Sequence, residues 1–191
     1  MPEPSNEEYG KGYFLIANPV LPDPNFSRTV VLLCNHDDQG SFGLVINRSA
    51  PIDSKEVFEE MGMSESPSGK IYLGGPVSPS QVFYLCHSEE PLPELESICD
   101  GVYLGMSWEL LDNLMTRVKN PEKNIRFYLG YSGWGAGQLA GEMTRLSWLT
   151  SAACDEFVFQ ENEDGIWKNV VRSLGKDYEY LVQAPVNPQW N

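Results

Sequence analysis

The sequence predicts an α+β fold with a mixed β-sheet, and two observations carry this prediction. Short apolar runs, several of them rich in β-branched residues, are clustered early in the chain, and amphipathic segments with helical periodicity are mixed with further strands later. Strands and helices do not alternate strictly, as they would in a parallel α/β sheet. The sequence contains no visible internal repeat.

The chain has 191 residues, of which 41% are hydrophobic. A chain of this length can bury a substantial core without disulfides or metals, so we expect one domain over residues 1–191. The polar, proline-containing ends, residues 1–10 and 184–191, are expected to form flexible or extended tails.

Three strands are predicted near the N-terminus. A short apolar run predicts a strand over 13–17, and the prolines that follow it force an irregular, turn-rich connection. The runs at 29–34 and 42–46 are apolar almost throughout, which predicts a hairpin buried on both faces.

A helix is predicted next. Asp53 or Ser54 can cap it, Met61 lies in its last turn and Gly62 ends it. Residues 64–69 are expected to form a loop.

Further strands are predicted at 71–73 and 81–86, on either side of a glycine-rich turn at 74–77. The acidic, proline-containing segment 88–96 is expected to be an exposed loop.

Asp100-Gly101 is a strong signal for a tight β-hairpin turn. After the hairpin, Ser107 is positioned to cap a helix that Asn120-Pro121 stops. The apolar face of this helix consists of Trp108, Leu111, Met115 and Val118.

Residues 130–142 are the most unusual stretch, because they contain five glycines, four of which lie between an apolar strand at 125–129 and an amphipathic run that begins at Gln138. We expect a strand, a strained loop and a helix start, with Leu139, Met143 and Leu146 on the buried face of the helix. Glycine permits positive φ and close backbone approach, and the free amides at the helix start offer a potential anion site.

The last predicted elements are a strand at 157–159 and an amphipathic helix that ends at Gly175. The apolar face of this helix consists of Ile166, Trp167, Val170, Val171 and Leu174.

The chain is strongly acidic, with 27 Asp and Glu against 13 Lys and Arg, a net charge of -14 and a pI near 4.4. This charge repels phosphate backbones and anionic lipids, so direct nucleic-acid binding is disfavoured. The basic-leaning window at 117–126 is better explained by cations at a helix C-terminus.

The cysteines and the N-terminal residues indicate the cellular compartment of the protein. The four cysteines show no Cys-x-x-Cys spacing, the first ten residues do not form an export signal, and no apolar run approaches the length of about 18 residues that a membrane span needs. We therefore expect a cytoplasmic protein with reduced thiols and no membrane association.

Two motifs in the glycine-rich stretch resemble known sites but lack their context. Residues 135–140 match a dinucleotide fingerprint, yet five residues separate it from the strand and about 50 residues remain after it. Ser132 lies in a near match to a nucleophile elbow, but Trp134 stands where glycine is required, and no histidine follows it. We disfavour both readings.

A Cys/His metal site is conceivable because both histidines closely follow a cysteine at a strand end. Neighbouring residues on a strand point to opposite faces, so Cys86 and His87 could ligate together only beyond the strand. Strand-end capping and buried thiols explain the same residues. We expect neither a metal nor a cofactor.

Several polar and aromatic residues have both a structural and a functional interpretation. Gln138 can satisfy loop amides while Glu142 pairs with a cation such as Arg145. Trp134 is either a recognition ring or, more plausibly, a lid over the core. Arg28 precedes a buried strand and needs a carboxylate or carbonyl partner, for which Asp23 is the nearest candidate in the sequence.

A set of motifs follows in order from Gly12 to Gly175. They are Gly12-Tyr-Phe-Leu-Ile-Ala17-Asn-Pro19; Asp23, Phe26 and Arg28; Gly40 and Gly43-Leu-Val-Ile-Asn47; Gly74-Gly75-Pro76-Val77; Gly130-Tyr131, Gly133-Trp134-Gly135, Gly137-Gln138-Leu139 and Glu142; Trp148; Trp167-Lys-Asn-Val; and Leu174-Gly175. In this combination the chain resembles the YqgE/AlgH proteins, a bacterial family.

The resemblance implies an α+β fold in which a strongly bent, mixed sheet forms a partial barrel with helices packed around it, in a cytoplasmic protein. It implies no catalytic residues. Members are often labelled transcriptional regulators, a label that the net charge and the lack of a basic recognition helix do not support here.

We expect a non-enzymatic module that binds a small molecule or a protein partner, with a possible regulatory role. The expected ligand-binding residues are Arg28, Asn47, Gly75, Gly133, Trp134, Gly135, Gly137, Gln138 and Glu142, on one face at strand ends. Two alternatives remain open: a hydrolase with a carboxylate base at the glycine-rich stretch, and a regulator that contacts DNA directly.

Overall fold

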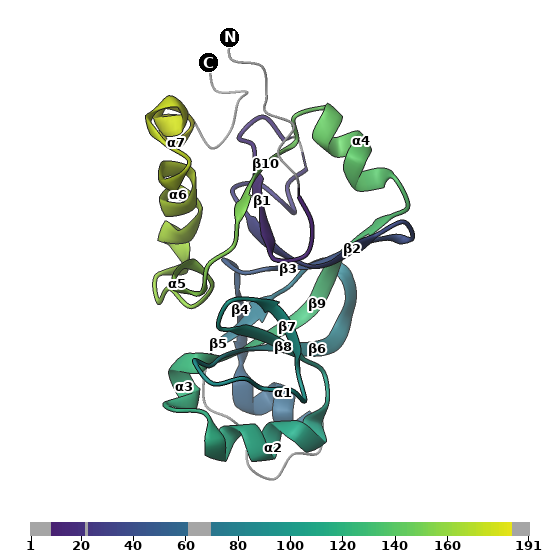
Figure 1. Ribbon diagram of the computed structural model, residues 1–191, viewed down its shortest axis with the longest axis vertical. Coiled ribbons are helices and arrows are strands. Elements are labelled where there is room, and N and C mark those ends of the chain that lie inside the picture. The colour runs from purple at the N-terminus through teal and green to yellow at the C-terminus, as the bar shows by residue number, and fades with distance from the viewer. Residues whose placement is uncertain (1–8, 22, 61–69, 185–191) are drawn as a thin grey trace.

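The computed structural model describes residues 9–21, 23–60 and 70–184 and has an α+β fold (Figure 1). The strands are β1 (Tyr13–Ala17), β2 (Val30–Asp37), β3 (Gly40–Val45), β4 (Ser49–Asp53), β5 (Lys70–Leu73), β6 (Val77–His87), β7 (Glu96–Cys99), β8 (Val102–Gly105), β9 (Ile125–Gly135) and β10 (Trp148–Ala152). The helices are α1 (Ser54–Glu60), α2 (Trp108–Arg117), α3 (Pro121–Asn124), α4 (Gln138–Thr144), α5 (Asp155–Val158), α6 (Glu163–Ser173), the 3-10 helix η1 (Lys176–Tyr178) and α7 (Glu179–Gln183).

The ten strands form one mixed sheet in the order β10-β1-β2-β3-β9-β6-β8-β7, with β5 added beside β9 and β4 beside β5. Strand β9 connects the two parts of this sheet. Its first half pairs antiparallel with β6 and parallel with β5, and its last residues pair with β3. Because one strand belongs to both parts, the two parts cannot separate without breaking β9.

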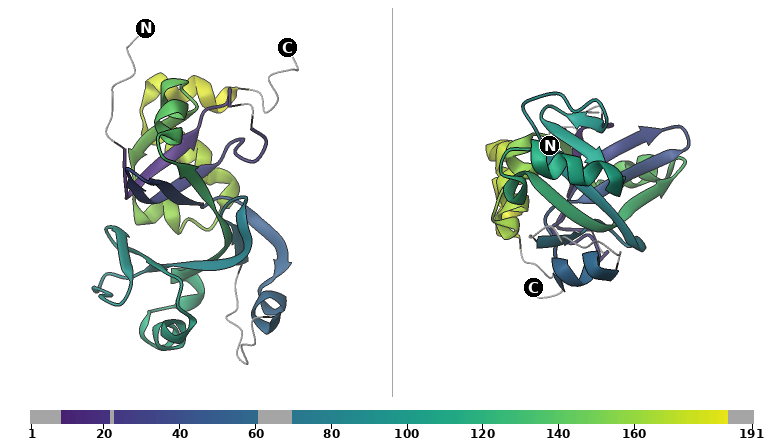
Figure 2. Two further views of the ribbon diagram at one scale, coloured as in Figure 1. Left: turned by 90° about the vertical axis from the view of Figure 1, so that its right-hand side faces the viewer. Right: turned by 90° about the horizontal axis from the view of Figure 1, so that it is seen from below.

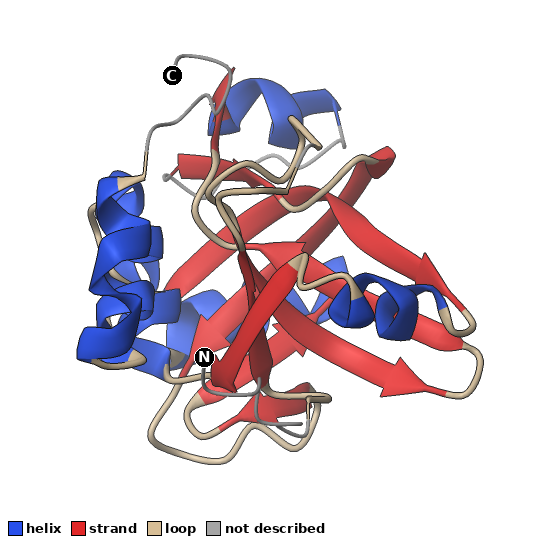
Figure 3. Ribbon diagram, turned by 90° about the horizontal axis from the view of Figure 1, so that it is seen from above, coloured by secondary structure: helices blue, strands red, loops and turns tan. Residues whose placement is uncertain are grey.

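The sheet curls into a half-barrel (Figure 3). Helices α1, α2 and α4 pack on its outer face, whereas α5 to α7 pack against the core inside the curl. Edge strand β7 approaches the start of β1 closely, since a Cβ added to Gly12 would lie 2.7 Å from the carbonyl oxygen of Ile98. Lys11 and Glu96 form an ion pair of 2.7 Å across the same seam. Helices α1 to α3 gather at one end of the molecule, away from α4 and α6 (Figure 2).

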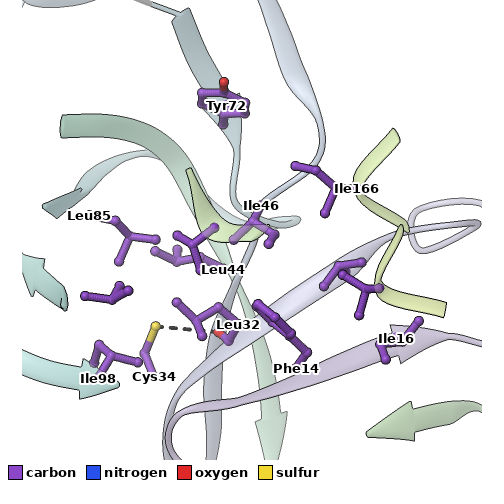
Figure 4. Close-up of a cluster of buried hydrophobic side chains, with 14 of the residues drawn as sticks. Phe14, Ile16, Leu32, Cys34, Leu44, Ile46, Tyr72, Leu85, Ile98 and Ile166 are labelled. Carbon is purple, nitrogen blue, oxygen red and sulfur yellow. Dashed lines mark hydrogen bonds between the residues drawn. The ribbon is translucent and has the colours of Figure 1, made fainter. Parts of the chain in front are cut away.

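The core consists of three clusters separated by the sheet. The largest fills the inside of the curl and includes Phe14, Leu32, Leu44 and Ile166 (Figure 4). A second lies between the sheet and α1 and α2, and a third lies on the other face of β1 to β3 beneath α4.

The predicted hairpin is confirmed. Strands β2 and β3 pair antiparallel, and alternate residues of β2 enter different clusters: Leu32 lies inside the curl, whereas Leu33 lies under α4. This division explains why the run is apolar at consecutive positions.

The predictions for β1, β5, the β7–β8 hairpin, α2 and α6 are also confirmed in type and approximate bounds. Ser107 stands at the N-cap of α2, but its side chain makes no capping hydrogen bond. Met61, Gly62, the loop 64–69 and most of the two tails lie outside the described residues.

The prediction that the glycine-rich stretch is mainly a loop was wrong. Strand β9 continues to Gly135, because residues 132–135 pair with residues 40–43 of β3 and so satisfy their backbone groups within the sheet. Only Ala136 and Gly137 form the turn into α4.

The strand predicted at 157–159 was also wrong, because Asp155–Val158 is the short helix α5. Cys154 is extended at the N-cap position, and two acidic residues occupy the first turn, where the helix dipole favours them. Phe157 still packs against the core, so its apolar side chain indicates burial but not a strand.

Three smaller differences concern side chains and element ends. Helix α4 ends at Thr144, so Leu146 has φ 56° and is 50% exposed instead of buried on the helix. The loop after β6 is not wholly exposed, since Leu92 and Leu95 are buried. Strands β4 and β10 and helices α3 and α7 were not predicted.

No helix within residues 9–21, 23–60 and 70–184 is long and apolar enough to cross a membrane.

Candidate functional site

The last four residues of β9 separate two hollows on the surface. Gly133 and Trp134 line both of them. We call the larger one, about 900 Å³, the mouth groove, and the smaller one, about 550 Å³, the tryptophan pocket.

The mouth groove opens between the tip of the β2–β3 hairpin and strands β6 and β8. Its apolar floor consists of Phe42, Phe83, Leu104 and Tyr131, with Met106 beside it. Phe42 lies 5.3 Å from Phe83 and 5.2 Å from Tyr131 between ring centroids. These rings also pack on the core inside the curl, so the groove is the open mouth of the half-barrel.

The rim of the mouth groove is polar and carries negative charge. It includes the amides of Asn35, Gln39 and Gln81 and the carboxylates of Asp37 and Glu96. Hydrogen bonds from the Asn35 side chain and the Gln39 backbone amide lower the pKa of Asp37, because they stabilise its ionised form.

The tryptophan pocket is walled by three aromatic rings. Phe26 lies 6.2 Å from Trp134 and 5.4 Å from Trp148, and the two indoles lie 6.0 Å apart at 79°. Trp134 is only 5% exposed and Trp148 only 2%. Trp134 is therefore mainly part of the core, as the lid interpretation predicted, and truncating it would unfold the site rather than test a contact.

Glu142 of α4 holds both indoles. Its Oε2 accepts hydrogen bonds from Nε1 of Trp134 at 2.9 Å and from Nε1 of Trp148 at 2.7 Å, and its Oε1 accepts one from Gln138 at 3.2 Å. The predicted pairing with Arg145 is wrong, because the described contacts of the carboxylate are these three neutral donors and no ion pair with Arg145 forms. The prediction for Gln138 is confirmed, because its Oε1 accepts the backbone N–H of Gly135 at 3.1 Å.

Two of the predicted glycines are required by the backbone, each for a different reason. Gly75 has φ +155°, and a Cβ there would lie 2.2 to 2.4 Å from backbone atoms of Tyr131 and Ser132. Gly137, at the turn before α4, has φ +74° but an added Cβ would meet nothing within 4 Å. Gly75 thus permits a close backbone approach, and Gly137 permits a positive φ.

Arg28 and Asn47 lie elsewhere, at a third hollow of about 260 Å³. The Asn47 amide ties the chain together, since it donates to the carbonyl of Arg28 at 2.9 Å and accepts from the amide of Val30 at 2.8 Å. The predicted partner of Arg28 is wrong: its guanidinium donates to the carbonyl of Ala184 and lies 5.0 Å from the Trp167 ring centroid.

The side chains considered as catalytic or metal-binding candidates make structural contacts instead. Ser132 is fully buried, and its hydroxyl donates to the Gly74 carbonyl at 3.1 Å. His36 Nδ1 lies 2.7 Å from the Ser41 hydroxyl, and His87 pairs with Asp155 at 3.0 Å. Among the described residues, no three His, Cys, Asp or Glu side chains converge as a metal site would require.

A family model described as AlgH-like matches residues 14–179 of the chain. The chain belongs to the AlgH-like family. Similar proteins include a "UPF0301 protein" of Cytophaga hutchinsonii, 38% identical over 182 residues, which covers 95% of this chain and 98% of that one. Another from Myxococcus xanthus is 39% identical over 173 residues, covering 89% and 93%.

Two solved structures share the fold of this AlgH-like chain. The solution structure of the AlgH protein from Pseudomonas aeruginosa has a TM-score of 0.73 and 32% identity, and the match covers 97% of this chain and 98% of that one. A crystal structure of a protein from Corynebacterium diphtheriae has a TM-score of 0.77 at 20% identity, covering 92% and 93%. The curled half-barrel sheet is therefore shared with the AlgH protein.

The functional reading of the sequence missed the aromatic residues that shape both hollows in this AlgH-like chain. Phe42 and Tyr131 were taken as parts of a buried hairpin and a loop, and Trp148 entered only as a motif residue. The sequence does not show which strands pair. Phe42 of β3 lies opposite Gly133 of β9, and because glycine has no side chain, the rings of Phe42 and Tyr131 have room to pack there.

Proposed function

We propose that this protein is a non-enzymatic binding module of the cytoplasm whose mouth groove takes a segment of a protein partner. The segment carries a large apolar side chain flanked by basic residues. Any regulatory role then acts through that partner and not through contact with DNA.

The observation that supports this function is the open, aromatic-floored groove at the mouth of the half-barrel. Barrel mouths are a common place for ligand sites. Partly exposed Phe42 and Tyr131 and the 55% exposed side chain of Met106 offer apolar surface that an occupant would remove from water. Aromatic residues and Met are enriched at protein interfaces.

The charge of the rim supports a basic partner. Asp37 and Glu96 lie on either side of the aromatic floor, in a chain of net charge -14. Glu96 pairs with Lys11, but this pair is exposed and contributes little in water. Complementary charge of this kind raises association rates and selects against acidic segments.

The two alternatives have less support. A hydrolase using Glu142 as base would have to release the carboxylate from two nearly buried indole N–H groups. Direct DNA contact would place a polyanion against an acidic chain.

Short peptides with a central Phe or Leu test this proposal. One series is flanked by Lys and Arg, and a matched series by Glu and Asp. We expect the basic series to bind at least about tenfold more tightly at low salt, with amide chemical-shift changes at Phe42, Tyr131 and Gly133. Equal binding of both series, or shifts outside the groove, would overturn the assignment.

Two exposed positions provide matched variants. Met106→Arg places a cation in the groove, and Tyr180→Arg places one at a side chain that is 68% exposed on α7. We expect Met106→Arg to abolish binding of the basic peptides and Tyr180→Arg to leave it unchanged.

A further inference from the structure

Three cationic side chains meet at the third hollow, although the chain as a whole is strongly acidic. Arg28, Arg48 and Lys168 line it, together with a single carboxylate, Asp164. Ser27 adds a hydroxyl. We call this hollow the arginine pocket.

The two arginines have no carboxylate within ion-pair distance among the described residues. Arg48 donates to the carbonyls of Pro24 at 3.3 Å and Ser27 at 3.1 Å, and the described contacts of Arg28 are the Ala184 carbonyl and the Trp167 ring. Carbonyl oxygens satisfy hydrogen bonds but leave the positive charge of a guanidinium uncompensated.

Partial burial makes the uncompensated positive charge of Arg48 less favourable. Desolvation lowers the pKa of Arg48 from its ordinary value, and the carboxylate of Asp23 acts in the opposite direction. A partly buried cation without a bonded carboxylate is stabilised when an anion enters beside it.

The backbone holds the pocket in place. Arg28 has φ 54°, a left-handed conformation that is uncommon and strained for a residue with a long side chain. The Asn47 amide fixes this conformation by accepting from Val30 and donating to the Arg28 carbonyl. The backbone of Arg28 is thus positioned before any ligand arrives.

We propose that the arginine pocket binds a small oxyanion of the phosphate class, either inorganic phosphate or the phosphate group of a small metabolite. Guanidinium groups present a planar set of donors that matches phosphate oxygens, and the exposed side chain of Lys168 adds a third positive charge. The volume of about 260 Å³ suits an anion of this size better than a nucleotide. This site is independent of the mouth groove and of the function proposed for it.

Calorimetric titration and thermal unfolding with sodium phosphate test the proposal, against sodium chloride at equal ionic strength. Chloride is needed because salt screens the self-repulsion of an acidic chain and stabilises it without a site. Glycerol phosphate in a parallel titration distinguishes a phosphate monoester from the free ion.

Lys168→Gln and Arg48→Gln are the test variants, and Arg172→Gln is the control. Lys168 is exposed and has no partner among the described residues, so its replacement leaves the fold intact. Arg172 lies on the same helix but pairs with Glu179 outside the pocket, so its loss changes net charge equally.

We expect phosphate to bind wild type and Arg172→Gln alike. Lys168→Gln should weaken binding about three- to tenfold, and Arg48→Gln by about tenfold or more. The proposal fails if phosphate stabilises no more than chloride does, or if Lys168→Gln and Arg172→Gln bind phosphate equally.

Discussion

Glu142 joins the two indoles that form the wall of the tryptophan pocket, so its carboxylate is a structural acceptor. Trp134 and Trp148 are nearly buried, and each has one N–H donor, which Oε2 of Glu142 accepts. A buried donor without an acceptor costs about 1–3 kcal/mol.

We predict that Glu142→Ala lowers the free energy of unfolding by about 2–4 kcal/mol, because both indole donors lose their acceptor. Glu142→Gln keeps one carbonyl oxygen and should lose clearly less. Urea unfolding followed by tryptophan fluorescence measures both. If the alanine and glutamine variants were equally stable, the carboxylate would not be the acceptor that orders the rings.

At the level of single residues, only local partners could be predicted from the sequence. The bond between Gln138 and the amide of Gly135 spans three residues and agrees with the prediction that Gln138 satisfies amides of this stretch. The bond between Arg28 and the carbonyl of Ala184 spans 156 residues, and no local pattern encodes it. Likewise, Glu142 was paired with a nearby cation because the orientation of the two indoles depends on the tertiary fold.

Strand β9 is the element on which both the mouth groove and the tryptophan pocket depend. It belongs to both parts of the sheet, and its last residues divide the mouth groove from the tryptophan pocket. The turn at Gly75 lies directly against its backbone. The geometry of the groove therefore depends on a glycine that lines neither hollow.

We predict that Gly75→Ala destabilises the protein by at least about 2 kcal/mol, because the new Cβ would overlap the backbone of β9. Gly137→Ala should cost only about 1 kcal/mol, since φ is positive there but the space is open. Thermal and urea unfolding of the two variants compare these costs. Equal destabilisation would show that conformation, and not close packing, requires both glycines.

At the level of elements, strands with long apolar runs could be predicted from the sequence, but which strands pair with one another could not. Five glycines indicated a loop because glycine weakens an isolated strand. Pairing of residues 132–135 with β3 supplies the backbone hydrogen bonds that overcome this weakness. The same dependence on pairing explains why β4 and β10, which are short, were missed.

Several ionisable groups lie in apolar surroundings in the core, on both faces of the sheet. Burial raises the pKa of Cys86 to about 12 and that of Tyr84 to about 12, and it raises the pKa of Cys34 well above its ordinary value. Each of these groups is neutral in the folded protein and ionises more easily once unfolded.

We therefore predict that stability is retained up to about pH 8.5 and falls as the pH rises through 9 and 10, because the unfolded chain releases protons that the folded chain keeps. The loss between pH 8 and pH 10 should be at least about 2 kcal/mol. Urea unfolding at the two pH values measures it, and Cys86→Ala should show a smaller loss. An unchanged loss in that variant would assign the effect to general charge repulsion.

The central claim at the scale of the whole molecule is that the mouth of the half-barrel is occupied by a protein partner. The most direct measurement places a photoreactive phenylalanine analogue at position 106, inside the groove, and, as a control, at position 180. After irradiation in cells, cross-linked products are identified by mass spectrometry. We predict one dominant protein cross-link from position 106, through a segment with basic and apolar residues, and none from position 180. An absence of specific products at position 106, or the same products from both positions, would contradict the claim.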